Sequence, residues 1–209
     1  MHKFLFAALT LALFHSPLPA QETAEKAREM TTNLEKIEGL IDKTVKELRE
    51  AIDQLNRIAA EADKPRDAYE DYTDQLKDYK GVQEDLSDRI DHFRKIADQR
   101  FKDWEADLAK MEGELKSISQ ERMNKAKKQY EEVDKKVRTI GAKLTKAVDK
   151  LQEVQTYFTT ELNAASIQAA GKVTDAAKKS ADDVIQALEE MKKDYAQLKA
   201  DTSESRPKE

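Results

Sequence analysis

The sequence predicts an all-α protein: an elongated antiparallel helical bundle of long, coiled-coil-like helices. The chain of 209 residues contains only five Gly and four Pro, and 38% of its residues are charged. Apolar residues recur at every third or fourth position along most of its length. Between residues 21 and 200 the one proline is Pro65. Few helix breakers combined with helical spacing is typical of long amphipathic helices that pack against one another.

The clearest helix is predicted at residues 119–161. The positions between its apolar residues are mostly Lys, Glu, Asp and Gln. Because spacings of three and four place the apolar side chains on one helix face, this helix needs partners along its whole length. The stripe consists of Met123, Ala126, Tyr130, Val133, Val137, Ile140, Leu144, Ala147, Leu151, Val154 and Phe158.

Two further helices are predicted before it, at residues 22–62 and 66–115. The first has a wide apolar stripe, which favours several neighbours in a bundle over a two-stranded coil. Pro65 marks the corner between them, because proline is tolerated in the first turn of a helix but not in its interior. Asp63 can cap the helix that follows.

The next corner is predicted near Gly113, where Ser117 and Gln120 have the spacing of a capping box. A last corner at residues 162–166 has a weaker signal, since this segment contains a plausible cap but neither Pro nor Gly. Two architectures therefore stay open.

In the first architecture four helices form the bundle, and the last of them covers residues 165–200. In the second there are three helices, and the last runs unbroken over residues 119–200. In both, residues 21–200 are expected to form one helical bundle domain, and the polar residues 201–209 a disordered tail.

Residues 1–20 have the features of a secretory signal peptide. Lys3 supplies the positive charge, residues 4–14 form an apolar run too short to span a bilayer, and cleavage is expected after Ala20. The chain contains no Cys, so a disulfide or a lipid anchor on cysteine is excluded. The sequence therefore predicts an exported protein, periplasmic or extracellular, that is not lipid-anchored.

Side chains that carry chemistry are mostly absent. His92 is the one histidine after residue 20, and Arg89, not Glu, precedes it by three positions, so a di-iron site built from Glu-x-x-His motifs is excluded. The net charge of −5 comes from well-mixed acidic and basic residues without a basic block that would follow a phosphate backbone. We therefore expect no catalytic, metal or cofactor-binding residues, no small-molecule substrate and no nucleic-acid partner.

One segment differs from the rest of the chain, and we call residues 154–171 the low-charge tip. Glu161 is its only charged residue, in a chain of which 38% is charged. Such a segment can contact a partner or lipid, or it can be buried by its own neighbours. The candidate interaction residues are Tyr157, Phe158, Leu162 and Ile167.

Residues 101–108 resemble a family signature. Phe101, Trp104, Glu105 and Leu108 match the Phe-x-x-Trp-Glu-x-x-Leu pattern of DUF2959, a bacterial family of unknown function. The resemblance extends over roughly residues 66–195 and implies an exported helical protein, without a known activity or catalytic residues. Many members look like lipoproteins with a signal-peptide Cys, which this chain lacks, so anchoring is not implied. Further along, Gln129 and Tyr130 fall where the family has Arg-Tyr, and its Phe-Leu-x-x-Asn-Leu-Asn-Ala-x-Ala-Ile run corresponds to Phe158, Leu162, Asn163, Ala164 and Ile167.

The predicted function is therefore a non-enzymatic, structural or protein–protein interaction role in the cell envelope. The partner is expected to be another envelope protein or a second copy of the chain. The alternative is a lipid-binding or membrane-active helical bundle that makes peripheral membrane contact through the low-charge tip.

Overall fold

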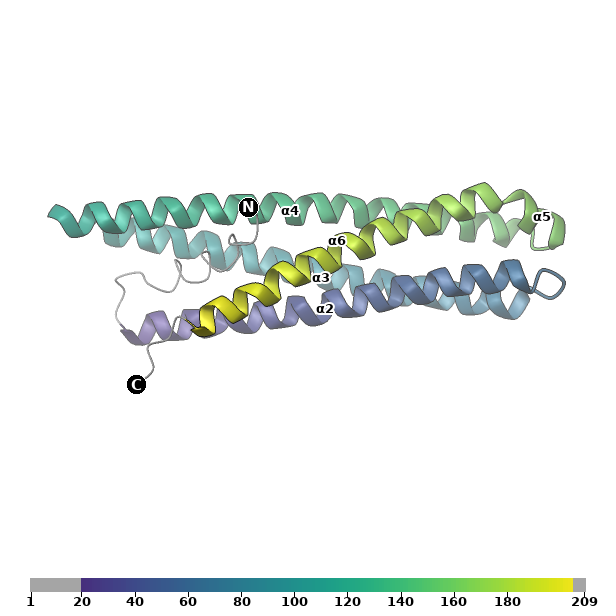
Figure 1. The fold of residues 1–209 in the computed structure, drawn as a ribbon, viewed down its shortest axis with the longest axis horizontal. Coiled ribbons are helices and arrows are strands. Elements are labelled where there is room, and N and C mark those ends of the chain that lie inside the picture. Colours follow the sequence, from purple (N-terminus) through teal and green to yellow (C-terminus); the bar gives the residue numbers. More distant parts are fainter. Residues whose placement is uncertain (1–19, 205–209) are drawn as a thin grey trace. The chain divides into compact units, whose positions relative to one another are not determined.

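The computed structural model describes residues 20–204, with side chains at residues 32–128 and 130–193. Every element in this part of the chain is a helix, which confirms the all-α class (Figure 1). The helices are α2 (Ala20–Ala60), α3 (Arg66–Ala109), α4 (Gly113–Thr160), α5 (Ala164–Ala169) and α6 (Gly171–Glu204).

The third corner does bend, so the four-helix alternative is the one observed. After α4 ends at Thr160, the short helix α5 precedes α6. Asn163 is the N-cap of α5: its Oδ1 accepts a hydrogen bond from the Ser166 backbone N–H at 3.0 Å. The Ser166 Oγ in turn accepts one from the Asn163 N–H at 2.9 Å. This reciprocal capping starts a new helix without Pro or Gly.

The second corner comes earlier than the sequence predicted. Helix α3 ends at Ala109 rather than at Leu115, and α4 begins at Gly113. Gly113 has a φ of +66°, a left-handed conformation that glycine adopts without steric cost. Ser117 and Gln120 consequently lie inside α4 and do not cap it. The prediction was wrong because Met111 and Leu115 continue the apolar spacing across the break.

The ends of the chain bear on two predictions. Helix α6 continues to Glu204, so residues 201–204 are helical where the sequence predicted a disordered tail. Residues 1–19 and 205–209 lie outside the described residues. The signal peptide therefore stays a prediction.

The helices pack into two compact units. Among the described residues, unit 1 contains residues 20–38, 88–138 and 190–204, and unit 2 contains Gly39–Ser87 and Thr139–Glu189. Each unit is thus built from segments far apart in sequence. The assignment of residues 21–200 to one domain stays a prediction.

Unit 2 is an antiparallel bundle of four helical segments with an apolar interior. Arg57 of α2 donates to Asp71 of α3 at 2.8 Å, and Lys178 of α6 to Asn56 of α2 at 3.2 Å. Both pairings join helices that run in opposite directions. The largest fully buried side chains of unit 2 are Tyr72, Tyr79, Leu48, Leu55, Ile58, Leu76, Leu86 and Leu151.

Two of these buried side chains, Tyr72 and Tyr79, differ in how their hydroxyls are satisfied. The Tyr72 hydroxyl donates to the Leu151 carbonyl oxygen at 2.7 Å. The Tyr79 hydroxyl has no hydrogen-bond partner among the described residues. Burial raises the pKa of both phenols, so both stay neutral near pH 7.

The two tyrosines therefore form a matched pair for phenylalanine substitution. We expect Tyr72→Phe to lower the free energy of unfolding by about 1 kcal/mol, because it removes a made hydrogen bond. We expect Tyr79→Phe to raise it by about 1 kcal/mol, because it removes a buried hydroxyl that has no partner. Urea unfolding followed by circular dichroism measures both. Changes of the same sign in the free energy of unfolding would contradict the difference in hydrogen bonding between the two hydroxyls.

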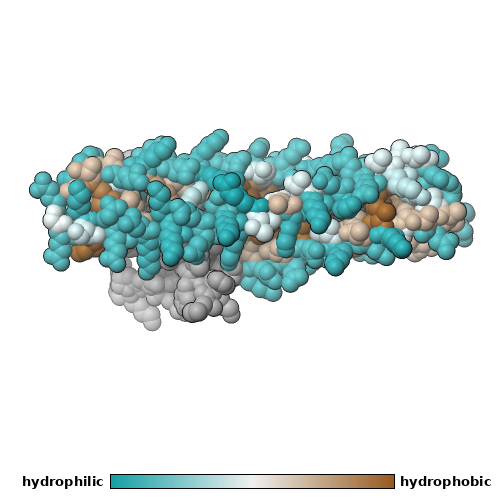
Figure 2. Space-filling model, turned by 90° about the horizontal axis from the view of Figure 1, so that it is seen from above, coloured by the Kyte–Doolittle hydropathy of each residue, from teal (hydrophilic) through white to brown (hydrophobic). Residues whose placement is uncertain are grey.

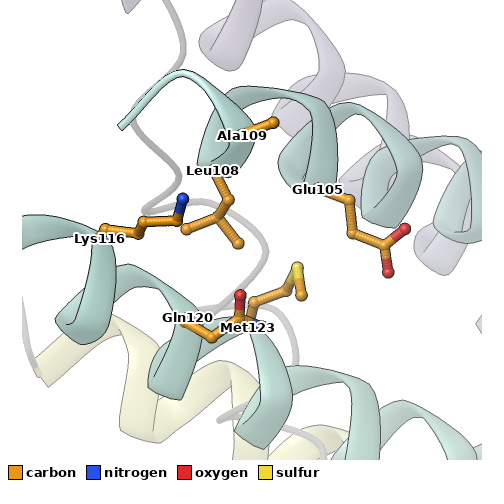
Figure 3. Close-up of a pocket in the computed structure, with 6 residues that line it drawn as sticks. All are labelled: Glu105, Leu108, Ala109, Lys116, Gln120 and Met123. Atoms are coloured by element: carbon orange, nitrogen blue, oxygen red, sulfur yellow. The ribbon is translucent and has the colours of Figure 1, made fainter. Parts of the chain in front are cut away.

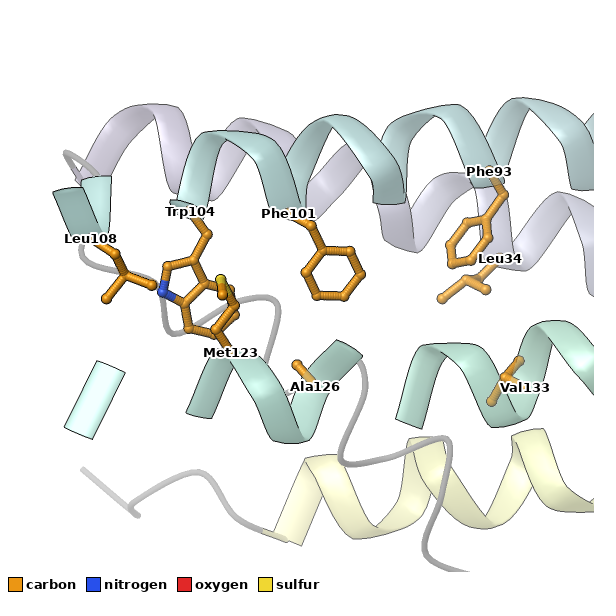
Figure 4. Close-up of a cluster of buried hydrophobic side chains, with 8 residues drawn as sticks. All are labelled: Leu34, Phe93, Phe101, Trp104, Leu108, Met123, Ala126 and Val133. Carbon is orange, nitrogen blue, oxygen red and sulfur yellow. The ribbon is translucent and has the colours of Figure 1, made fainter. Parts of the chain in front are cut away.

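Unit 1 has its core between α3 and α4, with Leu34 of α2 packed against it (Figure 4). The Trp104 indole is fully buried, and its Nε1–H donates to the Ser119 Oγ at 3.0 Å. The buried cluster consists of Leu34, Phe93, Phe101, Trp104, Leu108, Met123, Ala126 and Val133.

Candidate functional site

The four candidate residues of the low-charge tip divide into exposed and buried side chains. Tyr157 is 40% exposed, and Leu162 is partly exposed. Phe158 and Ile167 are only 3% and 8% exposed. The surface of this tip is therefore available through Tyr157 and Leu162, whereas Phe158 and Ile167 belong to the interior of unit 2.

Two tyrosine rings pack against Phe158. The Tyr69 ring of α3 lies 6.4 Å from it at an interplanar angle of 87°, and the Tyr157 ring lies 5.8 Å from it at 66°. Both are edge-to-face geometries that aromatic pairs favour. The Tyr69 hydroxyl also lies within hydrogen-bond distance of the Thr159 Oγ1, at 2.5 Å, and of the Gln155 carbonyl oxygen, at 3.2 Å. These contacts tie the end of α4 to α3.

The exposed threonines of the tip direct their hydroxyls to their own helix. The Oγ1 atoms of Thr156, Thr159 and Thr160 donate to the carbonyl oxygens four residues earlier at 2.9, 2.9 and 3.2 Å. Their donors are thus used within α4. Alanines at 164, 165 and 169 are exposed beside them. The right-hand end of Figure 2 shows this pale, weakly polar surface.

The start of α4 exposes two large apolar side chains that the sequence analysis did not single out. Leu115 is 74% exposed and Ile118 is 48% exposed. Most of the visible surface in Figure 2 is hydrophilic. Brown, hydrophobic atoms gather at the left-hand end, where α4 begins. The signal that could have found them is Gly113: a helix beginning there places Leu115 and Ile118 three residues apart in its first turns.

A shallow hollow lies between α3 and α4 in unit 1 (Figure 3). Its volume is about 370 Å³, near the lower limit for small-molecule sites. The Glu105 carboxylate is paired with the Lys127 ammonium at 3.3 Å. The hollow therefore presents aliphatic carbon together with the paired acid, the Lys116 ammonium and the Gln120 amide. Its lining residues are Glu105, Leu108, Ala109, Lys116, Gln120 and Met123.

A charged network in unit 1 centres on Asp134 of α4. Its Oδ1 accepts a hydrogen bond from Arg94 Nε and its Oδ2 one from Arg138 Nε, both at 2.6 Å. Burial on its own raises the pKa of the Asp134 carboxyl, but the hydrogen bonds from Arg138 and Arg94 outweigh it, so the pKa is lowered. The ionised carboxylate thus links α3 to α4.

We expect Asp134→Asn to lower the free energy of unfolding by about 1–3 kcal/mol at pH 7. Because the folded pKa lies below the unfolded one, the carboxylate stabilises the fold above pH ~4, and this stabilisation is lost as the pH falls through the folded pKa. Urea unfolding at several pH values should therefore show a weaker acid dependence for the variant. Asp88→Asn, at an exposed position of α3, is the control and should change stability by less than about 0.5 kcal/mol. An unchanged acid dependence in Asp134→Asn would contradict the assignment.

Among the side chains that the structure describes, no group of three or more His, Asp or Glu is placed to hold a metal ion. His92 is exposed on α3. In the same part of the chain, no helix has an apolar run of the length and hydropathy that crossing a membrane requires.

Comparison with protein-family models gives a match. The family model described as a protein of unknown function, DUF2959, matches residues 20–201. The match includes α2, which lies before the region where the resemblance was noted. Comparisons with curated proteins and with solved structures each found no match.

Proposed function

Since the chain belongs to the DUF2959 family of proteins of unknown function, we propose a function from its surface. The protein is a non-enzymatic, exported helical bundle of the cell envelope, and its low-charge tip binds another envelope protein. The single observation that carries this proposal is the half-exposed Tyr157 ring on a surface with one charged residue.

The packing beneath this surface supports the proposal. Tyrosine is enriched in protein interfaces, and charged residues are depleted at their centres. The Phe158 ring below Tyr157 is buried against Tyr69, and α5 is fixed by its reciprocal cap. A surface held in this way has little conformational entropy to lose on binding.

Export is supported by the sequence of residues 1–20. A positive charge, a short apolar run and a small residue at position 20 are the features that a secretory signal requires. Fusing residues 1–20 to a reporter that is active only after export tests this part. Reporter activity that survives replacement of the apolar run by polar residues would overturn it.

Site-specific photo-cross-linking in cells tests the tip. A photoreactive side chain at Tyr157 is expected to capture a discrete envelope protein, identified by mass spectrometry. The control position is Gln152, which is exposed on α4 about 140° around the helix from Tyr157. Equal capture from both positions, or none from Tyr157, would overturn the proposed contact.

Lipid binding is the alternative function of the same tip. Because Phe158 and Ile167 are buried in unit 2, insertion of these side chains into a bilayer requires the bundle to open. We therefore place a protein contact first. Flotation with neutral phosphatidylcholine vesicles distinguishes the two functions. Binding to vesicles that Tyr157→Glu abolishes, without capture of a protein, would replace the protein contact by the lipid contact.

A further inference from the structure

The first turns of α4 carry a face with an apolar centre and charged ends. Ile118, 48% exposed, lies at the centre, with Glu114 four residues before it and Arg122 four residues after it. Residues four apart lie on the same side of a helix. All three side chains are exposed, and so is Lys125 one turn further on. The face is therefore open to solvent along its length.

The charged ends of this face, Glu114 and Arg122, are exposed. Among the described residues, no ion pair joins Glu114 or Arg122 to another side chain, although α4 carries several others. Leu115, 74% exposed, lies about 60° to one side of Ile118 and widens the apolar centre. An acid, an apolar centre and a base thus follow one another in order.

We propose that this face binds the same face of a second copy of the chain, with the two α4 helices antiparallel and a two-fold axis at Ile118. A two-fold axis brings residue 118+n of one helix opposite residue 118−n of the other. Glu114 then meets Arg122 of the partner subunit, and Arg122 meets Glu114 of the partner subunit. The two Ile118 side chains pack against each other between these pairs.

The order of the charges favours a second copy as the occupant. On each helix the acid lies four residues before Ile118 and the base four residues after it. When a second copy runs antiparallel, the acid of each helix faces the base of the other, so one sequence supplies both halves of each ion pair. The contact is short, and interfaces of this size give weak, concentration-dependent association. This inference goes beyond the proposed function, because it concerns unit 1 and not the low-charge tip.

Disulfide trapping tests the position of the axis. The chain contains no Cys, so Ile118→Cys introduces the only thiol. At a two-fold axis the two thiols face each other within the reach of a disulfide. Mild oxidation of the full chain should cross-link Ile118→Cys at least about tenfold faster than Lys116→Cys, an exposed position on the opposite side of α4. Equal rates for the two variants would overturn the proposed axis.

Charge reversal tests the ion pairs. Glu114→Arg and Arg122→Glu, each alone, place like charges together and should raise the dimer Kd by about tenfold. Mixing the two variants should restore association as a heterodimer, and the double variant should restore the homodimer. Sedimentation equilibrium measures each mixture, and circular dichroism checks that the variants stay helical.

Two further outcomes overturn this proposal. One is a wild-type chain that stays monomeric over the whole concentration range, and the other is a double variant that associates no better than the single variants. Neither outcome bears on photo-cross-linking at Tyr157, because none of these substitutions lies in the low-charge tip. Failure of the dimer and failure of the proposed function are therefore distinguishable.

Discussion

Trp104→Ala is expected to lower the free energy of unfolding by about 3–5 kcal/mol. The indole is fully buried in the cluster between α3 and α4, beside Phe101, Leu108 and Met123 (Figure 4). Truncation removes its apolar contacts and leaves a cavity that close-packed neighbours fill only in part. It also removes the donor to the Ser119 hydroxyl. This loss is a large share of the ~5–15 kcal/mol that stabilises a typical protein.

The measurement is thermal and urea unfolding followed by circular dichroism, because Trp104 is the only tryptophan and its fluorescence is lost in the variant. Ser119→Ala is the matched control: it removes the hydrogen bond but keeps the indole, and should lower stability by about 1 kcal/mol. If Trp104→Ala has the same unfolding midpoint as Ser119→Ala, the indole does not form the centre of this core.

This result bears on what the family signature encodes. Phe101, Trp104 and Leu108 are all buried in unit 1, so packing accounts for three of its four defined positions. Glu105 is exposed and is paired with Lys127. A signature of this kind specifies how α3 meets α4. It identifies the family without identifying an activity.

The interior of α4 was predicted correctly from the sequence, whereas its beginning was predicted at residue 119 and lies at Gly113. Every member of the apolar stripe from Met123 to Phe158 is buried or half-buried. The apolar stripe predicts burial correctly here because the helix has partners along this length. It fails at the second corner, since Met111 and Leu115 keep helical spacing across a break that the backbone of Gly113 makes. Apolar spacing indicates which face of a helix is apolar, but it does not indicate where a residue adopts a left-handed backbone conformation.

The division into two units could not be predicted from the ends of the helices. Its boundaries fall inside α2, α3, α4 and α6, and each helix continues across them, even at Gly39, where unit 2 begins in α2. Sequence patterns mark the ends of helices, and these boundaries are not ends. The exposure of Ile118 and Leu115 follows from tertiary packing in the same way, because helical spacing alone favours burial of such residues.

In the low-charge tip, the apolar stripe predicted burial better than composition did. Phe158 lies four residues after Val154 and continues the stripe, whereas Tyr157 lies outside it. Low charge marked both as candidate interaction residues. The structure separates them: one ring is packed in unit 2, and the other is half-exposed above it. Substitution of Phe158 should therefore lower the stability of the fold much more than substitution of Tyr157.

Phe158→Ala is expected to lower the free energy of unfolding by about 3–4 kcal/mol, because the side chain is 3% exposed and packs against two tyrosine rings. Tyr157→Ala should lower it by less than about 1 kcal/mol, since its hydroxyl has no described partner and much of its ring meets solvent. Urea unfolding by circular dichroism compares the two variants with the wild-type chain. Similar losses would mean that the two rings share one environment.

The same two substitutions distinguish a role in packing the fold from a role in binding the envelope partner. If Tyr157 contacts the envelope partner, Tyr157→Ala abolishes co-purification of the protein captured by photo-cross-linking and keeps wild-type stability. Phe158→Ala should weaken co-purification only as far as it unfolds unit 2, so binding should return at lower temperature, where the folded fraction rises. Phe158→Leu keeps an apolar side chain beneath Tyr157 and should keep binding at all temperatures. Loss of binding in Phe158→Leu with an intact fold would move the contact from the exposed ring to the interior of the tip, and recognition would then require the bundle to open.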